Sequence, residues 1–308
     1  MSDSGNLIAV IGPTACGKSD LGVALAERLG GEVVNADASQ LYRGMDIGTA
    51  KMPLEQRRGV PHHQLDVLEV TEEASVAAYQ RDSRRDIDSI LDRGHVPVLV
   101  GGTGLYVRAA LDVLDIPPTD PGVREHFERR AATEGILALY SLLRQRDPNA
   151  AANILPSNER RVIRALEVIE LTGRPFSATM PRREFLRPTV MLGLDADRSV
   201  LDQRIDRRTM AMWDDGLVDE VRALDATGLR DGRTASRAIG YTQVLRQLDA
   251  ELTEAEAIED TARATKRLAR RQFSWFRPDP RITWLPHDAS DLMDRALEVI
   301  ASSRTMDA

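Results

Sequence analysis

The chain has 308 residues, 42% of them hydrophobic, and no apolar run approaches the ~20 residues that a membrane-spanning helix requires. A single cysteine excludes an internal disulfide framework and suits a reducing cytoplasm, where we expect the protein to work. The net charge of −7 argues against a uniformly basic nucleic-acid-binding protein. The first residues, 1–5, have neither the basic nor the apolar region of a signal peptide.

The first motif in the chain is a phosphate-binding loop. Residues 7–11 are an apolar run that predicts a buried strand, and leucines at every fourth position from Leu21 to Leu29 predict a helix. Between them stands GPTACGKS, which fits the pattern G-x-x-x-x-G-K-[ST] in its required context. Backbone N–H groups would bind phosphates, Lys18 would reach the terminal ones, and Ser19 would ligate Mg²⁺. The predicted di- or triphosphate loop comprises Gly12, Pro13, Thr14, Ala15, Cys16, Gly17, Lys18 and Ser19.

The next elements alternate between strand and helix. Strands are expected at 32–35 and 96–100 with a helix at 76–93, which predicts a doubly wound α/β layer. Ligands bind beyond the carboxyl ends of parallel strands, so Asp37 is expected beside the phosphate loop. Its spacing is equally compatible with a general base, a Mg²⁺ partner or a helix N-cap. The glycine turn after the third strand carries Thr103, whose hydroxyl we expect at the same rim.

Adjacent histidines at 62 and 63 suggest a metal site. Neighbouring side chains on a strand or loop face different ways, and no further Cys or His pattern supports metal binding. We therefore expect these histidines to be structural or to position a substrate.

A proline- and glycine-rich stretch at 116–122 predicts a domain boundary. Helical spacing follows at 123–134, 136–146 and 159–171, then strands at 189–194 and 282–285 with helices between and after them. The predicted architecture is an α/β core of residues 1–117 and 188–308, interrupted by a helical insertion at 118–187. Residues 121–190 contain twelve arginines and no lysine against eight acidic residues, so this segment is basic on an acidic chain and fits a polyanionic partner.

The last third of the chain contains two further basic patterns. Arg204 and Arg208 are four residues apart and share a helix face, where they would hold a diphosphate or simply pair with acids on the surface. Residues 261–277 contain six basic residues and no acid, and aromatic residues close this segment. Such a stripe suits phosphate contacts and base stacking, although the aromatics are equally suited to anchoring the final helix in the core.

Taken together, the motifs resemble the tRNA dimethylallyltransferase family, also called isopentenyltransferases. The segments that carry this resemblance occur in the family's order, from Gly12 to Arg277. They are GPTACGKS, the stretch from Asp37 to Lys51 with its DIGTAK block, PHHQLD, GGTGLY, ERRVIRALEV with TGRP, AIGY and RRQFSWFR. The resemblance implies a phosphate-loop core whose helical insertion grips the anticodon stem-loop. It also implies transfer of a dimethylallyl group from dimethylallyl diphosphate to N6 of the adenine immediately 3′ of the anticodon, in tRNAs that read codons beginning with U.

The resemblance assigns roles residue by residue. Asp37 matches the family's general base, and Thr103 matches a residue that lies near the reacting adenine. Arg208 matches an arginine that binds the diphosphate. Residues 14–19 would form the donor site, with Mg²⁺ on Ser19. The implied tRNA-binding residues are Asp37, Ala38, Ser39, Gln40, Thr103, Arg160, Arg161, Val162, Ile163, Arg164, Arg237, Gly240 and Tyr241. Ala38 stands where the family usually has serine, which puts one hydroxyl contact to tRNA in doubt.

Two other functions share parts of this pattern. A small-molecule or nucleotide kinase would also have the phosphate loop and the α/β layer, but it leaves the DIGTAK block and the arginine-only insertion without a role. A non-catalytic RNA-binding regulator would bind tRNA without changing it, and Asp37 and Thr103 argue against it. We expect a monomer without an obligate protein partner.

Overall fold

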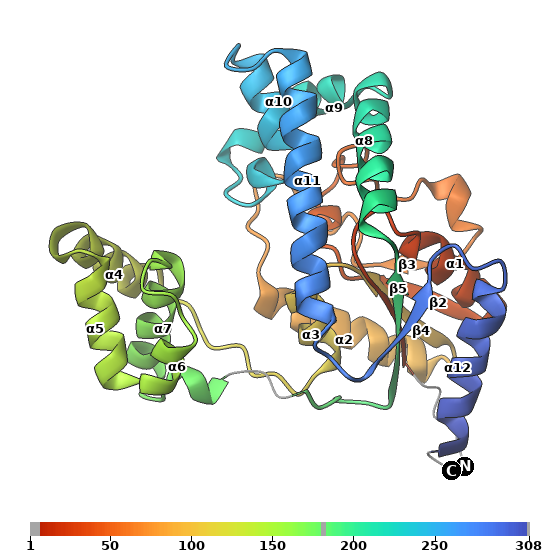
Figure 1. Ribbon diagram of the computed structural model, residues 1–308, viewed down its shortest axis with the longest axis horizontal. Helices are drawn as coiled ribbons and strands as arrows, with labels where there is room; N and C mark the ends of the chain where they lie inside the picture. Colours follow the sequence, from red (N-terminus) through yellow and green to blue (C-terminus); the bar gives the residue numbers. More distant parts are fainter. Residues whose placement is uncertain (1–6, 180–182, 307–308) are drawn as a thin grey trace. The chain divides into compact units, whose positions relative to one another are not determined.

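The computed structural model describes residues 7–179 and 183–306, so the N-terminal segment considered above for a signal peptide lies outside it. The chain divides into two compact units (Figure 1). Unit 1 comprises Met1–Leu111 and Phe185–Ala308, and unit 2 comprises Asp112–Glu184.

Unit 1 is built on a sheet of six parallel strands in the order β3-β2-β4-β1-β5-β6. The strands are β1 Leu7–Ile11, β2 Gly31–Asn35, β3 His62–His63, β4 Val96–Gly101, β5 Thr189–Asp195 and β6 Ile282–Pro286. The predicted α/β class with a phosphate loop is confirmed. The edge strand β3 was missed because two residues are too short to show a hydrophobic period.

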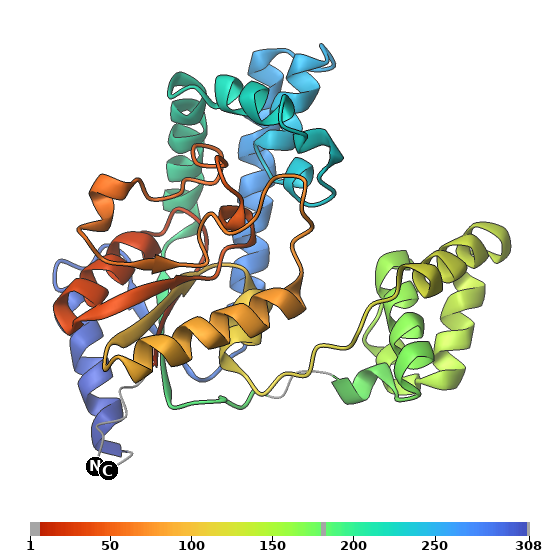
Figure 2. The same ribbon diagram turned by 180° about the vertical axis from the view of Figure 1, so that it is seen from behind.

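Within the described residues of unit 1, eight α-helices surround or extend this sheet (Figure 2). They are α1 Lys18–Leu29, α2 Val76–Asp92, α3 Gly104–Leu111, α8 Arg198–Asp214, α9 Leu217–Asp225, α10 Tyr241–Leu248, α11 Glu254–Phe276 and α12 Leu292–Met306. Helices α1 and α12 share a buried apolar core with the central strands, which contains Ile8, Leu25 and Ile300. A second core joins α8, α9 and α10 to the loop after β2 through Met45, Trp213 and Tyr241. That loop is therefore held by helices that come much later in the chain, since Trp213 and Tyr241 follow Met45 by 168 and 196 residues.

Unit 2 is a small helical bundle with its own core. Its helices are α4 Pro121–Glu134, α5 Ile136–Arg146, α6 Pro148–Ala152 and α7 Glu159–Thr172. Phe127, Leu139, Leu143 and Leu166 are buried at its centre. The five-residue helix α6 was not predicted, because a proline start and an Asp147 N-cap leave no room for a hydrophobic period.

The bounds of unit 2 differ from the predicted 118–187. The prolines taken as the boundary are bound to unit 2, because Arg164 of α7 donates to the carbonyls of Pro117 at 2.7 Å and Pro118 at 2.9 Å. At the base of the unit, the Val113 amide donates to the Glu184 carbonyl at 2.8 Å. The division therefore falls at Asp112 and Glu184 rather than at the proline-rich stretch.

Candidate active site

A cavity of about 670 Å³ opens at the carboxyl ends of the central strands. Its wall comes from several parts of unit 1: the phosphate loop, the ends of β2 and β4, the segments 49–56 and 62–65, and one face of α8. The polar and charged residues that line it include Thr14, Lys18, Ser19, Asp20, Asn35, Asp37, Gln40, Lys51, His62, Arg204, Arg207 and Arg208. The predicted donor loop and Asp37 thus share one cavity.

The phosphate loop takes the shape that its glycines permit. Gly12 has φ +147°, and a Cβ there would lie 3.0 Å from the Leu194 carbonyl oxygen. The Cys16 side chain is buried beneath the loop, which agrees with a packing role. The Lys18 ammonium donates to the Pro13 carbonyl at 2.5 Å, so it lies over its own loop at the mouth of α1.

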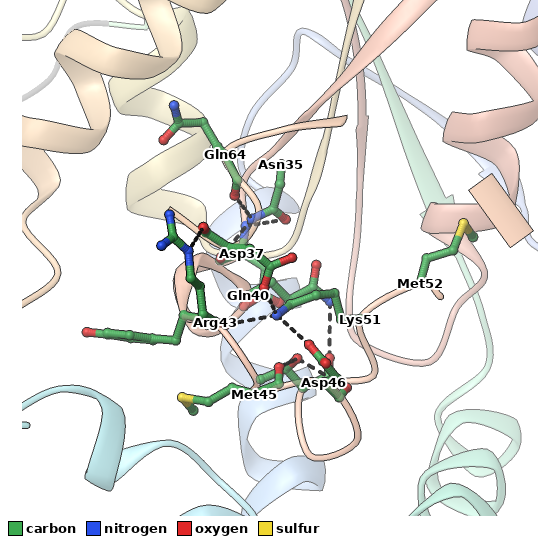
Figure 3. Close-up of polar contacts among 12 residues, drawn as sticks. Asn35, Asp37, Gln40, Arg43, Met45, Asp46, Lys51, Met52 and Gln64 are labelled. Carbon is green, nitrogen blue, oxygen red and sulfur yellow. Dashed lines mark hydrogen bonds and ion pairs between the residues drawn. The ribbon is translucent and has the colours of Figure 1, made fainter. Parts of the chain in front are cut away.

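Asp37 is fixed by a buried asparagine that sequence reasoning missed (Figure 3). The Asn35 amide group donates to the carbonyls of Asp37 at 3.0 Å and Gln64 at 2.9 Å, and its oxygen accepts from the Asp37 N–H at 3.1 Å. One carboxylate oxygen of Asp37 accepts from the Ser39 N–H at 3.0 Å and caps a short helix at Ala38–Leu41. Asp37 is therefore the N-cap of this short helix, and the capping hydrogen bond orients a carboxylate that also lines the cavity.

Thr103 lies against the Asp37 turn. Its hydroxyl accepts from the Ala38 N–H at 3.3 Å, and its own N–H donates to the Ala36 carbonyl at 3.2 Å. A Cβ at Gly101 would lie 2.3 Å from that same carbonyl oxygen, so glycine permits this approach. The two strand ends are thus joined directly, as expected from their place at one edge of the sheet.

Four cations face the cavity without a carboxylate partner among the residues that the structure describes. They are Lys18 from the loop and Arg204, Arg207 and Arg208 from α8. Burial lowers the pKa of the Arg208 guanidinium, and the nearby Asp37 carboxylate raises it. An arginine stays charged even so, and positive charge left unpaired in a cavity is suited to a polyanionic ligand.

The basic stripe on α11 behaves differently. Lys266 pairs with Asp206 of α8 at 2.6 Å, Arg270 lies 3.8 Å from Asp202, and Arg263 pairs with Asp260. Much of the charge that the sequence presents as free is therefore neutralised inside unit 1.

The aromatic residues at the end of α11 divide between core and surface. Phe276 is buried and Phe273 packs against the core beside Trp284, which is the anchoring role considered for them. Trp275 is 44% exposed.

Lys51 organises the loop that follows Asp37. This buried ammonium donates to the Tyr42 carbonyl at 2.8 Å and to the carboxylates of Asp46 at 2.7 Å and Asp66 at 2.6 Å (Figure 3). All three of its protons are used, so its role is to hold the loop closed. The Gln40 side-chain amide donates to the Thr49 carbonyl at 3.1 Å and ties the same loop to the Asp37 turn.

Glu220 of α9 holds the tip of this loop from outside. Its carboxylate accepts from the N–H groups of Asp46 at 3.1 Å and Ile47 at 2.8 Å, and from the Tyr241 hydroxyl at 2.5 Å. Burial and this carboxylate raise the pKa of Tyr241. A Cβ at Gly48 would lie 2.5 Å from the tyrosine ring, so only glycine fits there.

The residues predicted to touch tRNA separate into surface and interior. Arg160, Arg161 and Arg237 are exposed, and Asp37, Ala38, Ser39, Gln40 and Thr103 are partly exposed at the rim of unit 1. Four others, Val162, Ile163, Gly240 and Tyr241, are buried, so their side chains are not at the surface. Val162 and Ile163 belong to the hydrophobic core of unit 2, and Tyr241 belongs to the second core of unit 1. Arg164 is tied to the proline carbonyls described above.

Both histidines of the pair make hydrogen bonds within unit 1. His63 bonds the buried Glu32 carboxylate at 2.6 Å, and His62 bonds the Val60 carbonyl at 2.8 Å while lining the cavity. Within residues 7–179 and 183–306, no cluster of three metal-binding side chains occurs. No helix in these ranges is both long and apolar enough to cross a membrane.

A Mg²⁺ ion that binds mainly through phosphates needs little from the protein. It typically keeps several waters and takes one or two protein oxygens. The Ser19 hydroxyl lines the cavity and has no hydrogen-bond partner among the described residues, and the Asp37 carboxylate lines the same cavity. These oxygens fit such an ion.

Comparisons with known proteins show which family this chain is similar to. A family model described as IPP transferase matches residues 40–279. A tRNA dimethylallyltransferase of Thermobifida fusca is 61% identical over 299 residues, covering 96% of this chain and 94% of that protein. The structure of a full-length tRNA isopentenylpyrophosphate transferase from Bacillus halodurans has a TM-score of 0.71 at 42% identity, covering 98% of this chain and 97% of that one. A eukaryotic dimethylallyltransferase acting on tRNA has a TM-score of 0.80 at 28% identity, covering 99% of this chain and 80% of that one.

Proposed function

The chain belongs to the IPP transferase family, and we propose that it transfers the dimethylallyl group of dimethylallyl diphosphate to an adenine of tRNA. The acceptor is N6 of the adenine immediately 3′ of the anticodon, in tRNAs reading codons that begin with U, and diphosphate is released. The observation that carries the proposal is the set of unpaired cations that share one cavity with Asp37.

The cations stabilise the leaving group. As the allylic C–O bond breaks, negative charge grows on the departing diphosphate, and Lys18 and Arg208 bind that charge more strongly as it develops. The loop N–H groups and the start of α1 act in the same direction. Bound Mg²⁺, held by Ser19, would supply further charge stabilisation of the diphosphate.

Asp37 accepts the proton. An adenine N6 amine is a weak nucleophile whose proton becomes acidic as the N–C bond forms, so an ordinary carboxylate suffices as the base. The Ser39 N–H binds that carboxylate, and the Asn35 side chain holds the Asp37 backbone. We propose that the Thr103 hydroxyl, which accepts from the Ala38 N–H next to Asp37, contacts the same adenine.

The tRNA binds through charge on both units. Arg160 and Arg161 of unit 2 are exposed and have no acidic partner in the described chain, so they are available to phosphates. The target adenine has to leave the anticodon-loop stack to reach Asp37, as base-modifying enzymes generally require.

The direct test is to incubate the protein with Mg²⁺, dimethylallyl diphosphate and unmodified tRNA, digest the tRNA and determine nucleoside masses. An adenosine heavier by one dimethylallyl group is expected, with equimolar diphosphate released. Hydrolysis of ATP with a small acceptor and no change in tRNA mass would contradict the proposal and favour a kinase.

A further inference from the structure

Gln272 of α11 connects the phosphate loop to the turn that carries Thr103. Its side chain is 6% exposed. The side-chain oxygen accepts from the Thr14 N–H at 2.8 Å, and the side-chain nitrogen donates to the Gly102 carbonyl at 3.0 Å. One amide group therefore satisfies a loop donor and a turn acceptor at the same time.

The fit around this amide is close. A Cβ at position 102 would lie 2.3 Å from the Gln272 nitrogen and 3.0 Å from the Gly12 carbonyl oxygen. Glycine at 102 thus lets the glutamine and the phosphate loop approach the turn together. Since one partner is a donor and the other an acceptor, only an amide or a protonated carboxyl of this length satisfies both.

Through these two hydrogen bonds, Gln272 connects the loop proposed to bind the diphosphate to the turn proposed to contact the adenine. Gln272 binds Thr14 in the donor loop, and Gly102 is followed by Thr103. Thr103 in turn bonds Ala36 and Ala38, the residues on either side of Asp37. We propose that Gln272 is a positioning residue, which sets the distance from the bound diphosphate to the base and hydroxyl that act on the adenine. This inference rests on the proposed transferase function.

A Gln272→Met substitution tests the bridge because methionine keeps the length and bulk but makes neither hydrogen bond. The single-turnover rate is expected to fall about 10- to 100-fold, since small misplacements of reacting groups cost this much. The Kd for diphosphate with Mg²⁺ and the Kd for tRNA are expected to change by less than about threefold. A rate equal to wild type, or a loss explained by weaker binding alone, overturns the positioning role.

A Gln272→Glu substitution adds a readout that a purely structural role does not give. The ionised carboxylate accepts from Thr14 but repels the Gly102 carbonyl, whereas the protonated acid restores the missing donor. The rate relative to wild type is therefore expected to rise as the pH falls. A pH-independent ratio contradicts the proposal, and this variant decides the question if Gln272→Met does not fold.

Gln243→Met is the matched control. Gln243 is also 6% exposed and also makes two hydrogen bonds, to Gly240 at 2.9 Å and Asp260 at 3.0 Å, but away from the cavity. It is expected to lower Tm and leave the single-turnover rate within about twofold. An equal rate loss in this control overturns the inference. Failure of the wild-type chain to modify tRNA overturns the proposed function instead, so the two failures are distinguishable.

Discussion

Asp37 and Arg208 carry opposite charges into one cavity from the two sequence segments of unit 1, the first from the end of β2 and the second from α8. Burial lowers the pKa of the Arg208 guanidinium, and the nearby Asp37 carboxylate raises it. In the proposed reaction the pair flanks the transferred carbon, with the base on one side and the leaving-group cation on the other.

An Asp37→Asn variant is expected to lose turnover and keep its fold. The asparagine oxygen still accepts from the Ser39 N–H, but the neutral amide cannot accept the proton from adenine. The single-turnover rate is therefore expected to fall by about 10²- to 10⁴-fold. Its Tm and its Kd for tRNA are expected to stay near wild type. Asp219→Asn, an exposed surface carboxylate, is the control for loss of negative charge. A near wild-type rate in Asp37→Asn would remove Asp37 from the base role.

Arg208→Gln is expected to weaken diphosphate binding and to lower kcat about 10²- to 10³-fold, because its charge acts most strongly on the departing group. Steady-state kinetics and calorimetric titration with diphosphate measure the two effects. The control is Arg222→Gln, which removes an exposed arginine already paired with Asp219 at 2.7 Å. Similar losses in both variants would show a general effect of charge.

Glu220→Ala is expected to destabilise the protein by about 2–4 kcal/mol, because the loop N–H groups and the Tyr241 hydroxyl lose their acceptor. Chemical denaturation gives this free energy. Asp219→Ala, its neighbour on α9 with a surface ion pair, is expected to change stability by less than about 1 kcal/mol. Equal effects would mean that the loop is not held by Glu220.

Glu32 makes stability depend on acid pH. Burial by itself raises the pKa of this carboxyl, but hydrogen bonds from Arg93, His63 and His95 outweigh it and lower the pKa from 4.5 to about 2. The carboxylate therefore stabilises the fold above pH 4.5, by roughly 3 kcal/mol at 1.36 kcal/mol per pKa unit, and this contribution disappears as the pH falls toward 2. Glu32→Gln is expected to be less stable at neutral pH and to show a flatter stability curve between these values. An unchanged slope would contradict this assignment.

Binding of tRNA is expected to weaken steeply with salt, since phosphate contacts release counterions. The double variant Arg160→Gln/Arg161→Gln is expected to reduce the slope of log K against log salt by up to about 2. Arg146→Gln is the control in the same unit, because Arg146 is already paired with Glu170 at 2.9 Å. A slope unaffected by the double variant would place the tRNA elsewhere.

Local pattern was enough to predict that the phosphate loop, Asp37 and Thr103 lie at one edge of the sheet. The loop glycines, Asp37 and Thr103 each follow a recognisable strand, and the carboxyl ends of parallel strands meet at one edge. The supporting contacts were out of reach of such reasoning. Glu220 meets Asp46, and Gln272 meets Thr14, across 174 and 258 residues of sequence. Nothing in the spacing of either pair indicates contact.

The errors have a common physical origin. A motif records which residues occur together, but a helix buries one face and exposes the other within a few positions. Val162 and Ile163 therefore face the core of unit 2 while Arg160 and Arg161 remain outside. The charge of α11 was likewise overestimated because its partners, Asp202 and Asp206, belong to α8.

The chain leaves unit 1 at Leu111 and returns at Phe185, and the Leu186 N–H donates to the Leu111 carbonyl at 2.8 Å. The whole of unit 2 is thus inserted between Leu111 and Phe185 of unit 1, where the chain ends are joined by this hydrogen bond. A change of length within unit 2 is therefore expected to leave the register of the strands in unit 1 unchanged.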